Sequence, residues 1–247
     1  MIGTVLQQVL AFCYPSRCSA CDVACEGGAF LCPVCLCELM EMEEEGACNG
    51  CAMPLVCDGA PCAYCKGKGL RPYEKVLRLT TFAEPVRTAI VHMKYHRRWY
   101  LAEELGKRLL EQGDVREVVE GCDVIVPVPL YWRRQIKRGY NQSGVLARYL
   151  GGRCGKRVVG PVRRVLDTPS QTGKKTAADR WENVRDAFRL IRPGDVEGKR
   201  VVVVDDVMTT GATIKALGRE IMKGKPAGLS AVVVAIADPK GRGFEAI

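Results

Sequence analysis

Apolar positions in residues 73–247 follow two periods. Short continuous apolar runs predict buried strands, and apolar residues at every third or fourth position predict helices. The predicted strands are Val76–Phe82, Val124–Val128, Ala187–Ile191, Arg200–Val204 and Ala231–Ile236. The predicted helices are Pro85–Tyr95, Leu101–Leu110, Ser143–Leu150, Thr176–Arg185 and Thr213–Met222. Alternating strands and helices predict an α/β fold with a doubly wound parallel sheet, whose ligand is expected at the carboxyl ends of the strands.

The first 70 residues have a different pattern. Met1–Phe12 has apolar positions that suit a short amphipathic helix, too short to span a bilayer and without the charged start of a signal peptide. Twelve of the fourteen cysteines lie between Cys13 and Cys65, and the flexible, breaker-rich segment Lys66–Pro72 follows them. We therefore predict a small domain over residues 1–68, a larger one over 73–247, a cytoplasmic location and no membrane insertion.

The cysteines of the small domain form four Cys-x-x-Cys pairs. Two thiolates at this spacing can grip one face of a tetrahedral ion, and a second pair closes the site. A reducing compartment favours metal over disulfides. The predicted ligands of the two structural zinc sites are Cys18, Cys21, Cys32 and Cys35, and Cys48, Cys51, Cys62 and Cys65. An iron–sulfur cluster is the alternative, and Cys13, Cys25, Cys37 and Cys57 leave the choice of ligands open.

The net charge of +9 is unevenly distributed. The chain is 47% apolar, enough for a core, and 6% aromatic. Residues 1–70 carry a net charge of −5, whereas residues 130–200 hold 18 basic and 6 acidic residues, a net charge of +12. The basic region is consistent with binding of polyphosphate or nucleic acid, and a solvated surface without a partner is the alternative.

The segment Val201–Thr213 carries the most specific chemistry. Four valines fit a strand covered on both faces, and Asp205 and Asp206 follow at its carboxyl end, where they can accept hydrogen bonds from sugar hydroxyls. The turn then offers threonine hydroxyls and backbone N–H groups to a phosphate, with the positive end of a helix behind it. Gly211 lets the backbone approach the ligand closely. The alternative is a turn whose polar residues only cap the helix.

Two further segments add charged candidates. Val126-Pro127-Val128-Pro129-Leu130 predicts a fixed loop that frees backbone donors for a ligand, and basic residues follow it. Asn141 is expected to cap the next helix. Residues 164–185 are polar and basic, which suits either a mobile lid or a solvated loop.

Val201–Thr213 resembles the signature of the type I phosphoribosyltransferases, which bind 5-phosphoribosyl-1-diphosphate. Together, the motifs resemble the ComF family over nearly the whole chain. They occur in that family's order: the cysteine pairs, Lys94-Tyr95, the Pro-Val-Pro loop, Arg138-Gly139-Tyr140-Asn141-Gln142, the Thr168-to-Val184 segment and the Asp205-to-Thr213 motif. Tyr140 stands where the family often has Phe. The resemblance implies a zinc ribbon joined to a phosphoribosyltransferase-like domain, a link to natural competence, and single-stranded DNA and a competence helicase as candidate partners.

The resemblance also implies roles for individual residues. The candidate catalytic residues are Asp205, Asp206, Lys174 and Lys175. The candidate ligands of phosphoribosyl diphosphate are Asp205, Asp206, Val207, Thr209, Thr210, Gly211, Ala212, Thr213, Val128, Pro129, Arg133, Arg134 and Arg138. The candidate DNA contacts are Arg133, Arg134, Lys137, Arg138, Arg164, Lys174, Lys175 and Arg180. Mg²⁺ is expected to bridge the diphosphate and the ribose hydroxyls near the aspartates.

Two classes of function remain open. In the first, the protein is a phosphoribosyltransferase in which a nucleophile attacks C1 and releases pyrophosphate, by positioning and charge stabilisation. In the second, the same fold binds DNA or protein without turnover, and Trp132, Tyr140 and Trp181 are candidates to stack on bases. Neither His92 nor His96 is an obvious general base, and both are expected to be structural or on the surface.

Overall fold

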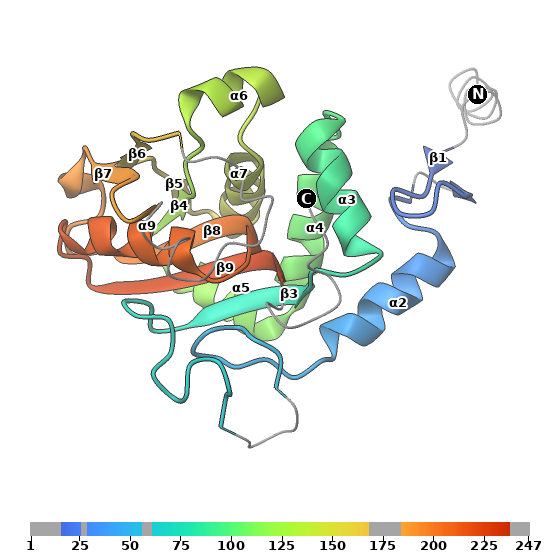
Figure 1. Cartoon of the computed structure of the whole chain (residues 1–247), viewed down its shortest axis with the longest axis horizontal. Helices are drawn as coiled ribbons and strands as arrows, with labels where there is room; N and C mark the ends of the chain where they lie inside the picture. Colours follow the sequence, from blue (N-terminus) through green and yellow to red (C-terminus); the bar gives the residue numbers. More distant parts are fainter. Residues whose placement is uncertain (1–15, 26–28, 56–60, 168–183, 238–247) are drawn as a thin grey trace.

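The computed structural model describes residues 16–25, 29–55, 61–167 and 184–237 (Figure 1). Its centre is a five-stranded parallel sheet of order β3-β9-β8-β4-β5. The strands are β3 (Val76–Thr81), β4 (Val124–Pro127), β5 (Arg157–Val158), β8 (Arg200–Met208) and β9 (Gly228–Ile236). The strand order confirms the predicted parallel α/β sheet.

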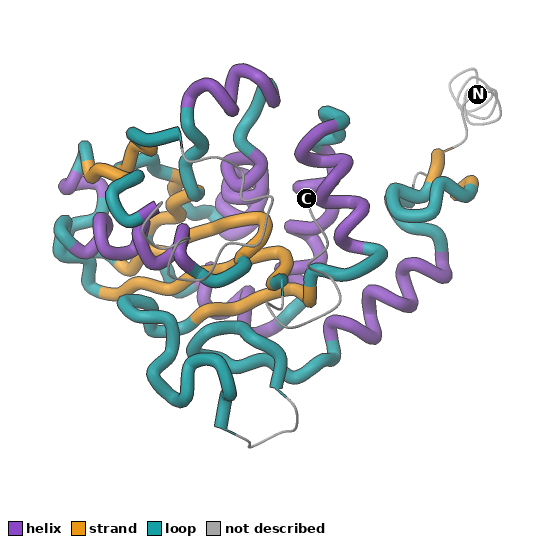
Figure 2. The backbone as a smooth tube through the Cα atoms, viewed as in Figure 1, coloured by secondary structure: helices purple, strands orange, loops and turns teal. Residues whose placement is uncertain are grey.

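Helices cover both faces of this sheet (Figures 1 and 2). One face is covered by α3 (Val86–Tyr95), α4 (Tyr100–Glu111), α5 (Gly113–Glu120) and α7 (Gln142–Cys154). The other face is covered by α9 (Ala212–Met222). Helix α6 (Trp132–Arg138) has no buried residue and stands at the edge of the molecule. Within the described ranges, no helix is both long and apolar enough to cross a membrane.

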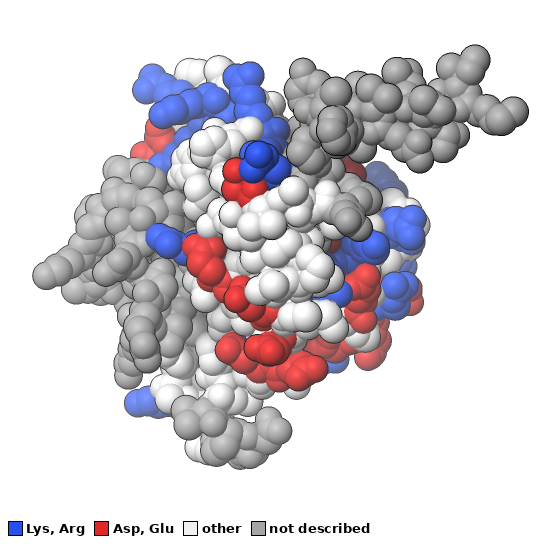
Figure 3. Space-filling model, turned by 90° about the vertical axis from the view of Figure 1, so that its right-hand side faces the viewer, with Lys and Arg blue, Asp and Glu red and all other residues white. Residues whose placement is uncertain are grey.

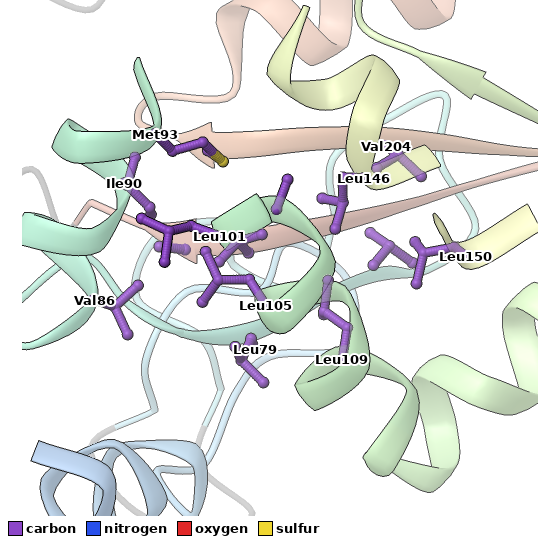
Figure 4. Close-up of a cluster of buried hydrophobic side chains, with 14 of the residues drawn as sticks. Leu79, Val86, Ile90, Met93, Leu101, Leu105, Leu109, Leu146, Leu150 and Val204 are labelled. Atoms are coloured by element: carbon purple, nitrogen blue, oxygen red, sulfur yellow. The ribbon is translucent and has the colours of Figure 1, made fainter. Parts of the chain in front are cut away.

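The valines of β8 alternate between the two faces. Val202 and Val204 pack into the cluster formed by α3, α4 and α7, part of which is drawn in Figure 4. Val201 and Val203 pack into the second cluster, which contains the buried side of α9. Because both faces are covered, every side chain of the central strand must be apolar until the strand reaches the edge of the sheet. This explains why the four valines end at Asp205.

The structure changes several predicted elements. Strands β8 and β9 are each nine residues long, longer than predicted, and β8 runs on through Asp205 and Asp206 to Met208. The segment predicted as strand Ala187–Ile191 forms β7 (Phe188–Leu190), which pairs antiparallel with β6 (Val162–Arg164) outside the main sheet and precedes the short helix η1 (Pro193–Asp195). The predicted Met1–Phe12 helix and residues 176–183 of the Thr176–Arg185 helix lie outside the described residues.

The acidic N-terminal part packs against the sheet domain through charged contacts. It begins with a hairpin of β1 (Ser16–Arg17) and β2 (Ala24–Cys25), followed by α2 (Pro33–Glu43), which has Pro at its first position. Arg108 of α4 forms an ion pair with Glu43 at the end of α2. The guanidinium of the buried Arg78 on β3 lies 3.7 Å from the carboxylate of Glu45. Acidic α2 is thus held by basic residues of the larger domain.

The segment predicted as a flexible linker is anchored to the core through Leu70, whereas Lys66, Lys68 and Arg71 are exposed. Leu70 is only 6% exposed, and its N–H donates to the carbonyl of Gly50 at 2.7 Å. The hydroxyl of Tyr73 is buried and donates to the carbonyl of Ile214 in the first turn of α9 at 2.8 Å. Leu70 and Tyr73 share one hydrophobic cluster with Cys51, Cys62 and α9. The second cysteine group is therefore continuous with the core of the sheet domain, and the division at residues 68 to 73 stays a prediction.

Candidate functional site

The candidate site lies where β4 ends and β8 continues. Strand β8 pairs with β4 only as far as Val204, whereas it pairs with β9 as far as Met208. Residues 205–208 therefore extend past β4 at the carboxyl end of the sheet. Parallel α/β sheets bind ligands at this end, in the crevice that opens where neighbouring strands part.

The two aspartates are buried at this edge, each 8% exposed. The Ser143 hydroxyl, from the first turn of α7, donates to Oδ1 of Asp205 at 2.8 Å. The backbone N–H of Asp206 donates to the same oxygen at 2.9 Å. Burial, together with the negative charge of Asp206, raises the pKa of Asp205 to about 7, although the Ser143 hydrogen bond and Lys94 oppose the shift. Two adjacent buried carboxylates favour a cation or hydrogen-bond donors beside them.

Lys94 supplies one cation. Its Nζ lies 3.2 Å from Oδ1 of Asp206, and both side chains are largely buried. The end of α3 that carries Lys94 is held in place by Tyr140, because the Tyr140 hydroxyl donates to the carbonyl of the preceding residue, Met93. Burial raises the pKa of Tyr140 to about 12, so this hydroxyl remains a donor at neutral pH. The Lys94-Tyr95 and Arg-Gly-Tyr-Asn-Gln motifs, far apart in sequence, therefore meet beside the aspartates.

The turn after β8 opens a helix, as predicted. Gly211 occupies the N-cap position of α9 with φ of +73°, and no side chain of the described residues caps the helix there. The first turn of an α-helix leaves backbone N–H groups without intrahelical partners, and these groups bind anions. The alternative, in which the polar residues of the turn serve only as a cap, therefore does not describe this helix start.

The structure adds a reason for glycine at position 211 that the sequence did not predict. A Cβ on Gly211 would lie 2.8 Å from Cδ1 of Leu70, so the missing side chain makes room for Leu70. The positive φ is a second reason for glycine. Leu70 is in turn tied to Gly50, which lies between Cys48 and Cys51. The second cysteine group thus contacts the turn through Gly50 and Leu70.

The Pro-Val-Pro loop differs from the prediction. The N–H of Val128 donates to the carbonyl of Val204 at 2.9 Å, so this donor is not free for a ligand. Asn141 occupies the N-cap position of α7, but it makes no capping hydrogen bond. Its Nδ2 donates instead to the carbonyl of Val128 at 3.0 Å. The side chain therefore fastens the loop to α7, and the predicted capping role was wrong.

The predicted basic residues divide into three groups. Four of them, Arg133, Arg134, Lys137 and Arg138, lie on α6, where Arg134 pairs with Asp167 at 3.2 Å. Arg164 is half-buried over the Phe188 ring, and its burial lowers the pKa of its guanidinium, which the charge of Asp205 partly offsets. Lys174, Lys175, Arg180 and Trp181 lie outside the described residues. Figure 3 shows basic side chains at the height of α6 and acidic ones at the height of α2.

The cysteines group as predicted. The sulfur atoms of each predicted set of four lie within 4.8 Å of one another. Cys21 and Cys32 are 3.6 Å apart at sulfur, and Cys48 and Cys65 are 3.7 Å apart. Tetrahedral zinc with Zn–S bonds of about 2.3 Å places its sulfur ligands about 3.8 Å apart. Both groups could therefore hold zinc.

Of the four other cysteines in residues 1–70, the structure describes Cys25 and Cys37, which differ in burial. Cys25 is buried beside the first group, and its thiol lies 3.7 Å from the carbonyl oxygen of Val23. Cys37 is exposed. Cys13 and Cys57 lie outside the described residues. The described structure therefore confirms the predicted division of the eight paired cysteines into two groups of four.

Comparison with known proteins agrees with this geometry. The family model of the phosphoribosyl transferase domain matches residues 137–246. The DNA utilization protein YhgH of Salmonella typhimurium is 30% identical over 195 residues, which cover 76% of this chain and 83% of that protein. Competence protein F of Haemophilus influenzae is 28% identical over 204 residues, covering 74% of this chain and 87% of the relative. The chain belongs to the ComF family.

Solved structures give a weaker likeness. The adenine phosphoribosyltransferase of Saccharomyces cerevisiae is 20% identical, covering 58% of this chain and 72% of that chain, with a TM-score of 0.36. The type I phosphoribosyltransferase-like fold of this ComF-family protein therefore rests on its strand order and on the family model. Its small N-terminal part supplies the two groups of four cysteines.

Several residues of the site were not predicted from the sequence. Ser143 and Leu70 contact Asp205 and Gly211, and each of these contacts joins segments far apart in the chain. Lys94 and Tyr140 were noticed only as parts of motifs. A signal for Ser143 was available, since it follows Asn141 in the first turn of a helix whose N-terminus faces the carboxyl ends of the strands.

Proposed function

We propose that this protein binds 5-phosphoribosyl-1-diphosphate with Mg²⁺ at the carboxyl end of β8. The observation that carries the proposal is the buried aspartate pair near the end of β8. The uncapped start of α9 follows this strand after a short turn. Asp205 and Asp206 accept hydrogen bonds from the ribose hydroxyls. Thr209–Thr213 and the N–H groups of α9 hold the 5-phosphate.

The donor atoms suit the proposed metals. Mg²⁺ prefers oxygen ligands and binds through one or two carboxylates together with substrate phosphates, which fits Asp205 and Asp206. When bound, Mg²⁺ would supply positive charge to the diphosphate. The two groups of four cysteines suit zinc in closed structural sites. Bound zinc would fix the loop of Gly50, and through it Leu70 and the phosphate-binding turn.

The residues around the site also support group transfer. Lys94 lies beside Asp206, and Arg164 lies within electrostatic reach of Asp205, so both can compensate negative charge on a departing diphosphate. Arg133, Arg134 and Arg138 on α6, together with Lys174 and Lys175, are further candidates for that role. Turnover also needs an acceptor nucleophile, whereas binding of phosphoribosyl diphosphate can be measured without one.

A second candidate function is the handling of single-stranded DNA in the cytoplasm. The names of two relatives, DNA utilization protein YhgH and competence protein F, motivate it. The net charge of +12 in residues 130–200 and the exposed, basic helix α6 supply sequence-independent contacts to phosphates. Arg164 is half-buried, so it suits this role less well than the α6 residues. A competence helicase is a candidate partner in the same process.

Isothermal titration of phosphoribosyl diphosphate, with and without Mg²⁺, tests the first proposal. The double variant Asp205→Asn/Asp206→Asn is expected to bind at least about 100-fold more weakly than wild type, because hydrogen bonds to charged groups contribute about 1.5–3 kcal/mol each. The matched control Asp186→Asn/Asp195→Asn changes the net charge equally, before β7 and in η1, and should bind within twofold of wild type. No binding by metal-loaded, folded wild type would refute the phosphoribosyl site and leave the alternative, a module that binds DNA or protein without turnover.

A further inference from the structure

A pocket lies between α4 and α7. Neither Asp205, Asp206 nor the turn before α9 lines it. Its volume is about 620 Å³, within the range of about 300–1,000 Å³ that is usual for sites of small organic ligands. The residues that matter for its chemistry are Arg97, Trp99, Arg138, Tyr140, Arg148 and Tyr149. They come from the turn before α4, the last residue of α6, the turn that follows it, and α7 itself.

Two aromatic rings of this pocket, those of Tyr149 and Tyr140, are held in place, and the ring of Trp99 is exposed beside them. The Tyr149 ring packs on Gly106 of α4, where an added Cβ would lie 2.7 Å from its Cδ1. The hydroxyl of Tyr140 is bonded to the carbonyl of Met93. Trp99 is 52% exposed, although it is among the largest apolar side chains. Fixed rings with an exposed face bind planar groups without first losing conformational freedom.

The charged groups of the pocket favour an anion. Three arginines and one carboxylate, that of Glu103, line it, which gives a formal net charge of +2. The guanidinium of Arg138 is oriented by the Tyr95 ring, 5.2 Å away, and by the side-chain oxygen of Gln142 at 3.3 Å. A ligand that satisfies both the rings and the arginines must be planar in one part and anionic in another.

We propose that this pocket binds a nucleotide unit of single-stranded nucleic acid. The base stacks on the aromatic walls, and the arginines contact the flanking phosphates. A strand can continue from Arg138 along α6, where Trp132 is exposed with Arg133 over its ring at 5.2 Å. The base must leave its stack to enter the pocket, which excludes an intact duplex. This inference rests on the second candidate function, the handling of single-stranded DNA, and it shares only Arg133 and Arg138 with the groups proposed to bind phosphoribosyl diphosphate.

Fluorescence anisotropy with a labelled 15-residue oligothymidylate tests the pocket. Trp99→Ala is expected to weaken binding about tenfold, because stacking contributes about 1–3 kcal/mol per base, whereas Trp99→Phe keeps a ring and should stay within threefold of wild type. Arg148→Ala should also weaken binding about tenfold and reduce the salt slope by about 0.7. The matched control is Arg153→Ala, which removes the same charge from an exposed position on α7 outside the pocket and should bind within twofold of wild type.

Several results would overturn the proposal. The first is that wild type does not bind, or that both Trp99→Ala and Arg148→Ala bind within twofold of wild type. The second is equal affinity for a 15-base-pair duplex. The third is competition by thymidine monophosphate alone at the same concentration as the oligonucleotide, which would assign the pocket to free nucleotides. Asp205→Asn/Asp206→Asn should keep its oligonucleotide affinity, so failure of the phosphoribosyl site would not be mistaken for failure of this pocket.

Discussion

Gly211→Ala tests the contact between the second cysteine group and the turn before α9. The added Cβ would lie 2.8 Å from Cδ1 and 3.3 Å from Cδ2 of Leu70, whereas carbon atoms in contact are about 3.5–4.0 Å apart. Leu70 would have to move by about 0.7 Å, yet it is buried and its N–H is bonded to Gly50. Such overpacking costs about 1–3 kcal/mol, and alanine at φ of +73° costs about 1 kcal/mol more.

We therefore expect Gly211→Ala to lower the free energy of unfolding by about 3 kcal/mol. In a chain of this size that corresponds to a fall of about 6–12 °C in Tm, measurable by calorimetry or urea unfolding. Gly152→Ala is the matched control. Gly152 lies within α7 with open space around it, so alanine there should stabilise the protein by about 0.5–1 kcal/mol.

A double-mutant cycle separates the steric contact from the backbone effect. Leu70→Ala removes the clashing atoms, at a cost of its own of about 2–5 kcal/mol. If the two side chains compete for one space, the double variant Leu70→Ala/Gly211→Ala should be at least about 1 kcal/mol more stable than the sum of the single effects predicts. Additive effects, within about 0.5 kcal/mol, would refute the steric explanation of Gly211.

The remaining predictions concern titration, metal and the loop. Asp205→Asn should gain stability over wild type as pH rises from about 4 to 7, by at most about 4 kcal/mol, because a carboxyl with a raised pKa loses its stabilising contribution as it ionises; urea unfolding from pH 4 to 8 measures this, and a pH-independent difference would contradict it. Cys51→Ser and Cys21→Ser should each lower the zinc content from two ions to one, but only Cys51→Ser should weaken phosphoribosyl diphosphate binding about tenfold, by calorimetry; equal effects would contradict the link through Leu70. Asn141→Asp should cost about 1–3 kcal/mol in thermal unfolding, because a carboxylate cannot donate to Val128, and an unchanged Tm would contradict that role.

The central part of the fold could be predicted because burial leaves a clear pattern. Strand β8 is covered on both faces, so its valines form an unbroken apolar run that ends at Asp205. The cysteine pairs were equally clear, because the spacing within each pair reflects the geometry of one metal ion. Helix α6 was missed for the opposite reason: none of its residues is buried, so it shows no apolar period.

The support of the site could not be read from the sequence. Tyr73 bonds to Ile214 across 141 positions, and Ser143 bonds to Asp205 across 62. No local pattern encodes such pairs, since each residue is compatible with many partners until the fold brings them together. Lys66–Pro72 has the composition of a linker, but tertiary packing of Leu70 overrides that local preference. The local pattern predicted the turn between β8 and α9, but it did not predict the residues that hold this turn in place.

X-ray diffraction from crystals soaked with phosphoribosyl diphosphate and Mn²⁺, recorded at the zinc and manganese absorption edges, tests the central claim most directly. The account predicts the 5-phosphate at Thr209–Thr213, the ribose hydroxyls on Asp205 and Asp206, manganese beside that pair, and one zinc ion in each group of four cysteines. A ligand bound elsewhere, or an empty turn beside a fully loaded pair of zinc sites, would contradict it.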